Sequence, residues 1–185
     1  MFKGSGMRVS RLLLGLAILT SGGAEASELA DISAYMEYSP VFSSSGQPTA
    51  EQLKSLKAEG FQRVVYIAFT DQDSAVRAED RLVKDLGMDY LQVPVDWNAP
   101  GNSDFYVFAD AMQRASGKRT LLHCQANYRA SAFAFLYRVL YDDVPMAVAK
   151  RDMNKIWKPN DRWRKLIFDI LEENGKSPHC EDCEW

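Results

Sequence analysis

Short apolar runs alternate with segments of helical periodicity along most of the chain. Four runs are rich in β-branched or aromatic residues and short enough to be buried strands, at residues 32–38, 63–69, 89–95 and 119–123. Between and after them, apolar residues recur every three or four positions, which predicts helices at 49–59, 75–86, 103–116, 130–141, 145–153 and 161–173. This alternation predicts an α/β fold, with a central, mostly parallel sheet and helices on both faces.

Several predicted helices begin with residues that are suited to capping. Thr49 and Gln52 have the spacing of a capping box, in which each side chain accepts a hydrogen bond from the other's backbone. Ser103 and Asn160 are predicted to cap two later helices. The polar residues 43–46 are interpreted as a loop before the first of these helices.

The first 26 residues have the three parts of a secretory signal peptide. Three basic residues precede an apolar run at 12–20, and a small-residue cleavage site ends at Ala26. The apolar run is shorter than the ~20 residues of a membrane span, and an uncleaved N-terminal anchor is the alternative interpretation. We therefore expect residues 27–185 to form one domain without a membrane span, in the periplasm or outside the cell.

Charge and composition exclude some classes of partner. The full chain has a net charge of −3, and loss of the predicted signal peptide makes it more acidic, because that segment is mainly basic. Nucleic acids and anionic membranes are bound through a basic excess that is concentrated on one face. We therefore expect no nucleic-acid partner. The hydrophobic fraction of 46% suits a single buried core.

The chain has three cysteines, and two of them lie close together near its end. Cys180 and Cys183 form a Cys-x-x-Cys arrangement in the predicted tail, residues 175–185. In an oxidising compartment this pair is expected to close a small disulfide loop, with metal binding or thiol exchange as alternatives. A zinc site needs a second pair of ligands, so no metal is assigned. Cys124 is left as a single thiol.

The strongest chemical signal is the passage from a strand into a helix at residues 121–131. Cys124 follows the strand, and four residues separate it from Arg129. Backbone N–H groups and the helix dipole at such a place favour an anion, and they favour a thiolate over a thiol. Arg129 adds a planar charged group suited to phosphate or sulfate oxygens, whereas Arg138, further along the helix, is expected to be exposed. One loop can thus hold a nucleophile and the oxyanion that it attacks.

These residues resemble the cysteine-dependent protein tyrosine and dual-specificity phosphatases, whose active loop reads His-Cys, five residues, Arg. The four-residue spacing here is similar to that of a bacterial subgroup related to the domain fused to some β-lactamase-fold hydrolases. It is also the spacing of sulfurtransferase loops in the rhodanese family. The resemblance to the bacterial subgroup extends through residues 46–53, 60–65 and 93–96. It implies a cysteine-phosphatase-like α/β domain that acts on a phosphorylated substrate or binds an oxyanion.

The resemblance implies roles for the residues of the loop. Cys124 would attack phosphorus and Arg129 would bind the phosphate oxygens, together with the loop residues Gln125, Ala126, Asn127 and Tyr128. No glycine occurs between Cys124 and Arg129 to supply a positive φ, and Asn127 is the expected substitute. The loop is therefore expected to be a tight anion-binding turn.

Other residues are expected to assist this loop. Asp96 matches the position of the general acid in related phosphatases, and Asp104 is the competing candidate. His123 is expected to point to the opposite side of the strand from Cys124 and to support the loop. Ser131 is a candidate donor to the thiolate, although Ala130 occupies the place where the family usually has a hydroxyl.

Three functions from different classes follow from this pattern. The first is an exported phosphatase that hydrolyses phosphate monoesters through a thiophosphate on Cys124. The second is a sulfurtransferase or persulfide-handling enzyme, because a tight loop also suits a persulfide. The third is a catalytically silent module that binds an anion or a protein. None of them calls for a cofactor, and the sequence specifies no partner protein.

Overall fold

The structure is a computed structural model that describes Met1 and residues 28–180, 183 and 185. Apart from Met1, the predicted signal peptide lies outside the described residues. Among the described residues, no helix is both long and apolar enough to cross a membrane.

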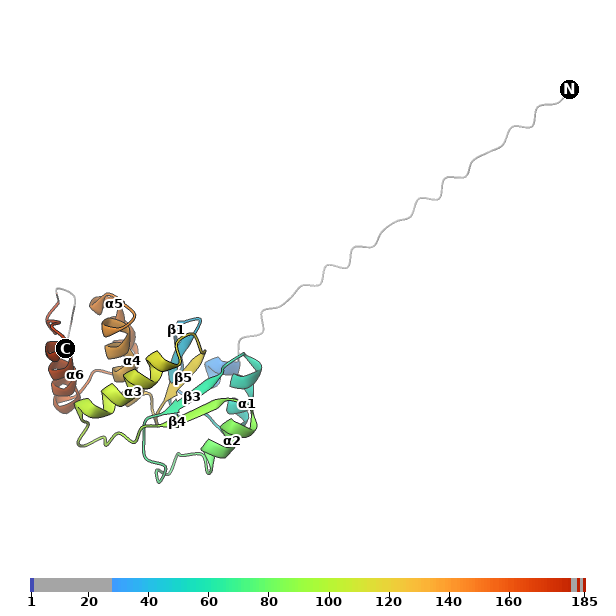
Figure 1. Cartoon of the computed structure of the whole chain (residues 1–185), viewed down its shortest axis with the longest axis horizontal. Coiled ribbons are helices and arrows are strands. Elements are labelled where there is room, and N and C mark those ends of the chain that lie inside the picture. The colour runs from blue at the N-terminus through green and yellow to red at the C-terminus, as the bar shows by residue number, and fades with distance from the viewer. Residues whose placement is uncertain (2–27, 181–182, 184) are drawn as a thin grey trace.

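A five-stranded sheet forms the centre of the domain (Figure 1). The strands are Met36–Ser39 (β1), Phe42–Ser45 (β2), Arg63–Tyr66 (β3), Asp89–Gln92 (β4) and Thr120–His123 (β5). Their order is β1-β2-β5-β3-β4, and only β1 runs antiparallel to its neighbour. The predicted mostly parallel sheet is confirmed. The central strand β5 leads directly to Cys124, so the sheet positions the reactive loop.

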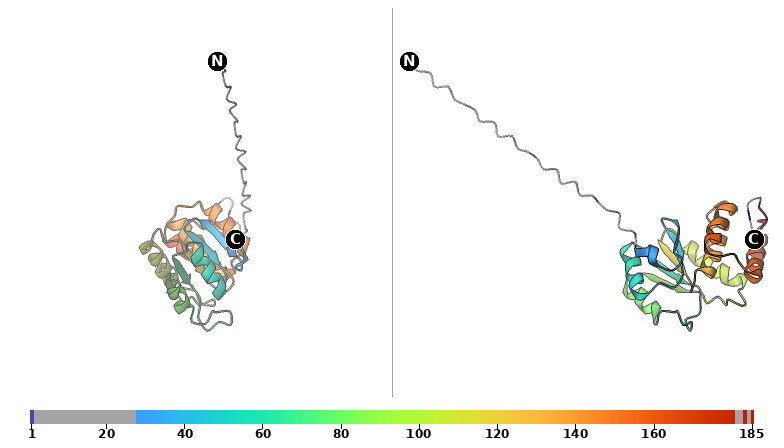
Figure 2. Two further views of the ribbon diagram at one scale, coloured as in Figure 1. Left: turned by 90° about the vertical axis from the view of Figure 1, so that its right-hand side faces the viewer. Right: turned by 180° about the vertical axis from the view of Figure 1, so that it is seen from behind.

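Helices cover both faces of the sheet, as predicted (Figures 1 and 2). A short 3-10 turn at Glu28–Asp31 (η1) packs on one face with two helices, Ala50–Ala58 (α1) and Glu79–Asp85 (α2). The helices on the other side are Asn102–Arg114 (α3), Tyr128–Leu140 (α4), Met146–Ile156 (α5) and Asp161–Glu173 (α6). Strand alternation produces the two cores, because Val64 and Leu121 face the first group while Val65 and Leu122 face the second.

Side-chain hydrogen bonds cap the starts of α1, α3 and α6. Thr49 and Gln52 form the predicted capping box, and the Asn160 side chain accepts from the Trp163 N–H at 3.1 Å. The prediction that Ser103 caps α3 is wrong. The helix begins one residue earlier, and its Asp104 carboxylate accepts from the Gly101 N–H at 3.0 Å. A carboxylate in the first turn stabilises a free backbone donor as well as the helix dipole.

The interpretation of residues 43–46 as a loop is wrong for Ser43, Ser44 and Ser45, which form most of the buried strand β2. Their hydroxyls find partners inside the fold. Ser43 bonds the hydroxyl of Tyr35 at 3.0 Å, and Ser44 bonds that of Tyr38 at 2.7 Å. Because each buried hydroxyl is paired, a polar run can occupy the sheet interior.

The expectation that Arg138 is exposed is also wrong. Its side chain is buried, lies over the Tyr38 ring and forms an ion pair with Asp152 at 3.0 Å. Burial alone raises the pKa of Asp152, but hydrogen bonds from Lys155 and Arg138 lower the pKa below its ordinary value. The ion pair thus allows a charged side chain to lie between α4 and α5.

The C-terminal tail packs on the domain. Cys180 and Cys183 are disulfide-bonded, which confirms the predicted small loop. Trp185 packs against Phe135 and Phe168, and its indole N–H donates to the Pro178 carbonyl at 2.8 Å. These contacts attach the end of the chain to α4 and α6.

Candidate active site

Cys124 lies at the carboxyl end of β5, where the chain turns into α4. Its backbone N–H donates to the Ser45 carbonyl at 3.3 Å, and only 1% of the residue is exposed. It nevertheless lines an open pocket of about 330 Å³, whose other lining residues are Trp97, Gln125, Ala126, Tyr128 and Arg129. The structure therefore brings the predicted nucleophile, the predicted oxyanion ligand and most of the loop to one pocket.

Asn127 gives the loop its turn. Its φ is +65°, in the left-handed region, as expected from the lack of glycine. The side chain is fully buried, and its Nδ2 donates to the Ala34 carbonyl at 2.7 Å. This hydrogen bond ties the turn to the segment before β1 and supports a backbone conformation that few side chains adopt.

The segment after β2 braces the loop from the other side. The Gln47 N–H donates to the Gln125 carbonyl at 3.0 Å, and Gly46 forms an isolated bridge with Ala126. A Cβ atom at Gly46 would lie 2.9 Å from the Gln125 carbonyl oxygen, which is too close for any side chain. The reactive loop can approach β2 this closely only because residue 46 is glycine.

Arg129 is a buried cation without a carboxylate partner among the described residues. Only 4% of it is exposed, and its Nη1 donates to the Val95 carbonyl at 2.9 Å. Its Nη2 donates to Gln125 Oε1 at 2.7 Å, and Gln125 Nε2 donates in turn to Gln72 Oε1 at 3.0 Å. All these acceptors are neutral. A buried charge costs free energy unless it is paired, so the guanidinium favours an anionic guest.

Backbone donors of the loop add to this preference. Within the described part of the chain, the N–H groups of Gln125, Ala126, Tyr128 and Arg129 make no hydrogen bond. The N–H groups of Tyr128 and Arg129 also belong to the first turn of α4, where the helix dipole is positive. The loop therefore combines free donors, a helix end and a buried cation around a sulfur atom.

The structure places Asp96 next to this site but not in the pocket wall. Asp96 is exposed, and its Oδ1 accepts from the Asn98 N–H at 2.7 Å. The preceding residue, Val95, supplies the carbonyl that binds Arg129. The competing candidate, Asp104, is already engaged at the start of α3. The Asp104 carboxylate thus caps a helix, whereas the Asp96 carboxylate does not.

His123 and Ser131 both contact other groups than the thiol. His123 points away from Cys124 and stacks on Tyr66, with the ring centroids 4.7 Å apart. Its Nε2 lies 3.1 Å from Glu79 Oε1. The expectation that Ser131 donates to the thiolate is not met. Its hydroxyl donates to the Tyr128 carbonyl at 3.1 Å and accepts from the Trp157 indole N–H at 3.1 Å. Ser131 therefore fixes the first turn of α4.

An aromatic wall borders the pocket. Trp97 and Tyr128 line it, and Tyr128 stacks on Trp157 with the ring centroids 5.0 Å apart. Trp163 lies behind Trp97 at 5.4 Å and donates from its indole N–H to the Trp97 carbonyl at 3.1 Å. The sequence does not show that Trp157, just after α5, and Trp163 of α6 contribute to this wall, because both lie far from the loop along the chain. The wall gives the pocket a flat apolar side beside its charged end.

Fold and site together define a cysteine-phosphatase-like domain, and the comparisons with known proteins agree. The family described as DSP-PTPase phosphatase fused to NAD+ kinase matches residues 24–163, so the chain belongs to this family. A structure described as a candidate DUF442 phosphatase from Shewanella putrefaciens CN-32 is 35% identical, with a TM-score of 0.72. That match covers 79% of this chain and 96% of the other.

More distant structures share the fold. Tk-PTP in its active form is 14% identical, with a TM-score of 0.64 over 75% of this chain and 97% of its own. TpbA from P. aeruginosa, in complex with phosphotyrosine, is 16% identical, with a TM-score of 0.61 over 85% of this chain and 98% of its own. A comparison with curated proteins finds no match.

The close approach of Gly46 to the loop leads to a prediction about stability. Gly46→Ala should lower the free energy of unfolding by about 1–3 kcal/mol, because the new methyl group would overlap the Gln125 carbonyl. Urea unfolding followed by tryptophan fluorescence measures this. Gly101→Ala is the matched control, since a Cβ there meets its nearest atom, Ser103 Oγ, at 3.4 Å and none of the reactive loop. Equal stability of the two variants would contradict the argument.

Proposed function

We propose that this protein hydrolyses phosphate monoesters and uses Cys124 as its nucleophile. The observation that carries the proposal is the shared pocket of Cys124 and Arg129, in which the buried guanidinium has no carboxylate partner among the described residues. A phosphate group supplies a negative charge for Arg129 and oxygen acceptors for the free N–H groups of the loop. Membership of a phosphatase family supports the same reaction.

The reaction has two displacements. The Cys124 thiolate attacks phosphorus, the bond to the ester oxygen breaks, and the alcohol leaves with a proton. Water then attacks the thiophosphate, the P–S bond breaks, and inorganic phosphate leaves while the thiolate is restored. Arg129 and the loop N–H groups stabilise the oxygens in both transition states, an effect whose loss typically costs ~2.7–4 kcal/mol per donor.

Asp96 is proposed as the group that protonates the leaving oxygen. It follows Val95, whose carbonyl binds Arg129, so the start of its loop is attached to the oxyanion site. The protonated Asp96 carboxyl group would give its proton to the ester oxygen in the first step, and the resulting carboxylate would take a proton from water in the second. The adjacent Trp97 lines the pocket, so a substrate that fills it meets this loop.

The aromatic wall makes aryl phosphates suitable substrates. Trp97 and Tyr128 present ring surfaces beside the charged end of the pocket, and aromatic groups pack well on such surfaces. The phosphotyrosine complex of TpbA supports the choice of an aryl ester. We propose aryl phosphate esters as the first assay substrates.

Replacement of the nucleophile tests the reaction. With 4-nitrophenyl phosphate, Cys124→Ser should lower kcat by about three orders of magnitude or more, because the serine hydroxyl is a far weaker nucleophile. Wild-type turnover that persists in Cys124→Ser would contradict the proposal. Sulfur transfer from thiosulfate to cyanide without phosphatase activity would instead indicate a sulfurtransferase. Phosphate binding without either activity would indicate a silent anion-binding module.

The leaving group tests the role of Asp96. Asp96→Asn should slow hydrolysis of phenyl phosphate by at least about tenfold more than that of 4-nitrophenyl phosphate, because only the poorer leaving group depends on protonation. The ratio of the two kcat values is the measurement, and Asp104→Asn is the control. Equal slowing of both substrates in Asp96→Asn, or the same bias in Asp104→Asn, would remove Asp96 from the acid role.

We also propose that the protein is exported, on the basis of the predicted signal peptide at residues 1–26 and the small disulfide near the C-terminus. Intact-mass spectrometry of the protein from the periplasmic fraction or the medium should give a chain that begins at Ser27. Recovery of the chain only from the cytoplasm with Met1 retained would contradict export.

A further inference from the structure

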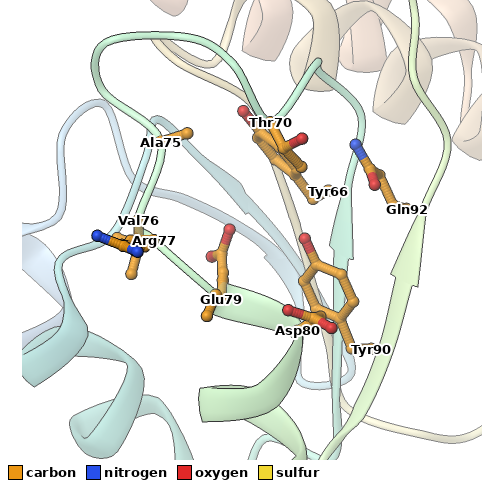
Figure 3. A pocket seen from close by; sticks show the side chains of 10 residues that line it. Tyr66, Thr70, Ala75, Val76, Arg77, Glu79, Asp80, Tyr90 and Gln92 are labelled. Carbon is orange, nitrogen blue, oxygen red and sulfur yellow. The ribbon is translucent and has the colours of Figure 1, made fainter.

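A second pocket, here called the Glu79 pocket, opens at the carboxyl ends of β3 and β4, beside the start of α2 (Figure 3). Its volume is about 530 Å³, and it shares no lining residue with the pocket at Cys124. The side chains that line it are mostly polar, and they include Tyr66, Thr70, Glu79, Asp80, Tyr90 and Gln92. It is therefore a separate polar site on the face of the sheet opposite Cys124.

Glu79 is a buried carboxylate that points into this pocket (Figure 3). Only 4% of the residue is exposed. Its Oε1 accepts from Gln47 Nε2 at 3.2 Å and lies 3.1 Å from His123 Nε2. Neither ring nitrogen of His123 makes a hydrogen bond within the described part of the chain, so this contact is not a well-directed one. The second oxygen, Oε2, has no partner among the described residues and remains for a guest.

Neutral acceptors surround this carboxylate. Burial is the main cause that raises the pKa of Tyr66, to about 12, and the charge of Glu79 adds to it. The same two causes raise the pKa of Tyr90, so both phenols stay neutral. The Tyr90 hydroxyl has no hydrogen-bond partner among the described residues, and Figure 3 shows it pointing toward the cavity. Gln92 Nε2 donates to the Ala68 carbonyl at 3.0 Å, which leaves the Gln92 side-chain oxygen as an acceptor. The pocket thus offers several oxygens around one buried negative charge.

The charge of the Glu79 pocket is negative. Glu79 and Asp80 both line it, and Arg77, the one Lys or Arg among the described residues of its wall, turns away from Glu79 in Figure 3. No ion pair links Arg77 to Glu79 or Asp80. Oε1 of Glu79 contacts His123, whereas Oε2 has no ion pair among the described residues, so a positively charged guest at Oε2 would stabilise the buried carboxylate.

We propose that the Glu79 pocket binds a small organic cation through a primary ammonium group. An ammonium has three N–H donors, which match Glu79 Oε2, the Tyr90 hydroxyl and the Gln92 side-chain oxygen. The Tyr66 and Tyr90 rings suit the charge and the alkyl part of such a guest. A divalent metal ion is a poorer match, because it needs about six oxygen ligands and one Glu79 oxygen is already engaged.

The Glu79 pocket is linked to the reactive loop by two contacts. Glu79 contacts His123, which precedes Cys124, and it accepts from Gln47, whose backbone N–H donates to the Gln125 carbonyl. A guest that binds the Glu79 carboxylate therefore affects its contacts with His123 and Gln47, which support the loop. The proposal concerns binding alone, so it stands or falls independently of the phosphatase reaction.

Calorimetric titration of the full chain with butylammonium chloride and with 1,4-diaminobutane tests the proposal, with 1-butanol as the neutral control. Both cations should bind with a Kd on the order of 1 mM or tighter, and 1-butanol should not. Glu79→Gln should weaken binding by at least about tenfold, because a charge-assisted hydrogen bond is lost. Asp85→Asn, on the same helix but outside the pocket, should bind as the wild type does.

Tyr90→Phe is a second variant that keeps the buried carboxylate, in case Glu79→Gln does not fold. It should weaken binding of both cations by about threefold or more, through loss of one hydrogen bond. The proposal is overturned if neither cation binds, if 1-butanol binds equally well, or if Mg²⁺ binds in place of the ammonium ions. Unchanged affinity in Tyr90→Phe, or in a folded Glu79→Gln, would overturn it as well.

Discussion

The reactive end of this protein depends on a buried guanidinium whose ligands are all neutral. Arg129 is held by a backbone carbonyl from the Asp96 loop and by the Gln125 side chain from its own loop. These contacts fix the position of the charge without neutralising it. The buried positive charge of Arg129 and the helix N-terminus both favour an anion. The site is therefore preorganised for an anionic guest.

The sheet separates two regions of opposite charge. Cys124 and His123 are neighbours at the end of β5, and strand alternation sends their side chains to opposite faces. One face holds Arg129 and the free loop donors, while the other holds Glu79 and its ring of neutral acceptors. The central strand thus brings a cationic and an anionic pocket within a few residues of each other, one on each side of the sheet.

Local signals in the sequence predict the fold and the loop well, whereas contacts between distant residues are not predicted. The capping box at Thr49 and the left-handed turn at Asn127 follow from side-chain chemistry that acts over a few residues. The sequence does not predict the buried strand at Ser43 and Ser44, because its hydroxyls are satisfied by tyrosines that the fold brings to them. The contact of Glu79 with His123 was missed for the same reason, since it depends on where α2 begins.

We propose phosphate, rather than a persulfide, as the group that the short loop binds. A persulfide on Cys124 is small and carries a single charge, so it would leave the other donors of the site unmatched. The structure instead places the Arg129 guanidinium and the free N–H groups of the loop at the pocket that Cys124 lines. The loop has four residues between Cys124 and Arg129 in place of five. Its close approach to Gly46 and the left-handed turn at Asn127 nevertheless keep these donors together. Several donors at one pocket match the oxygens of a phosphoryl group, which supports the proposed hydrolysis.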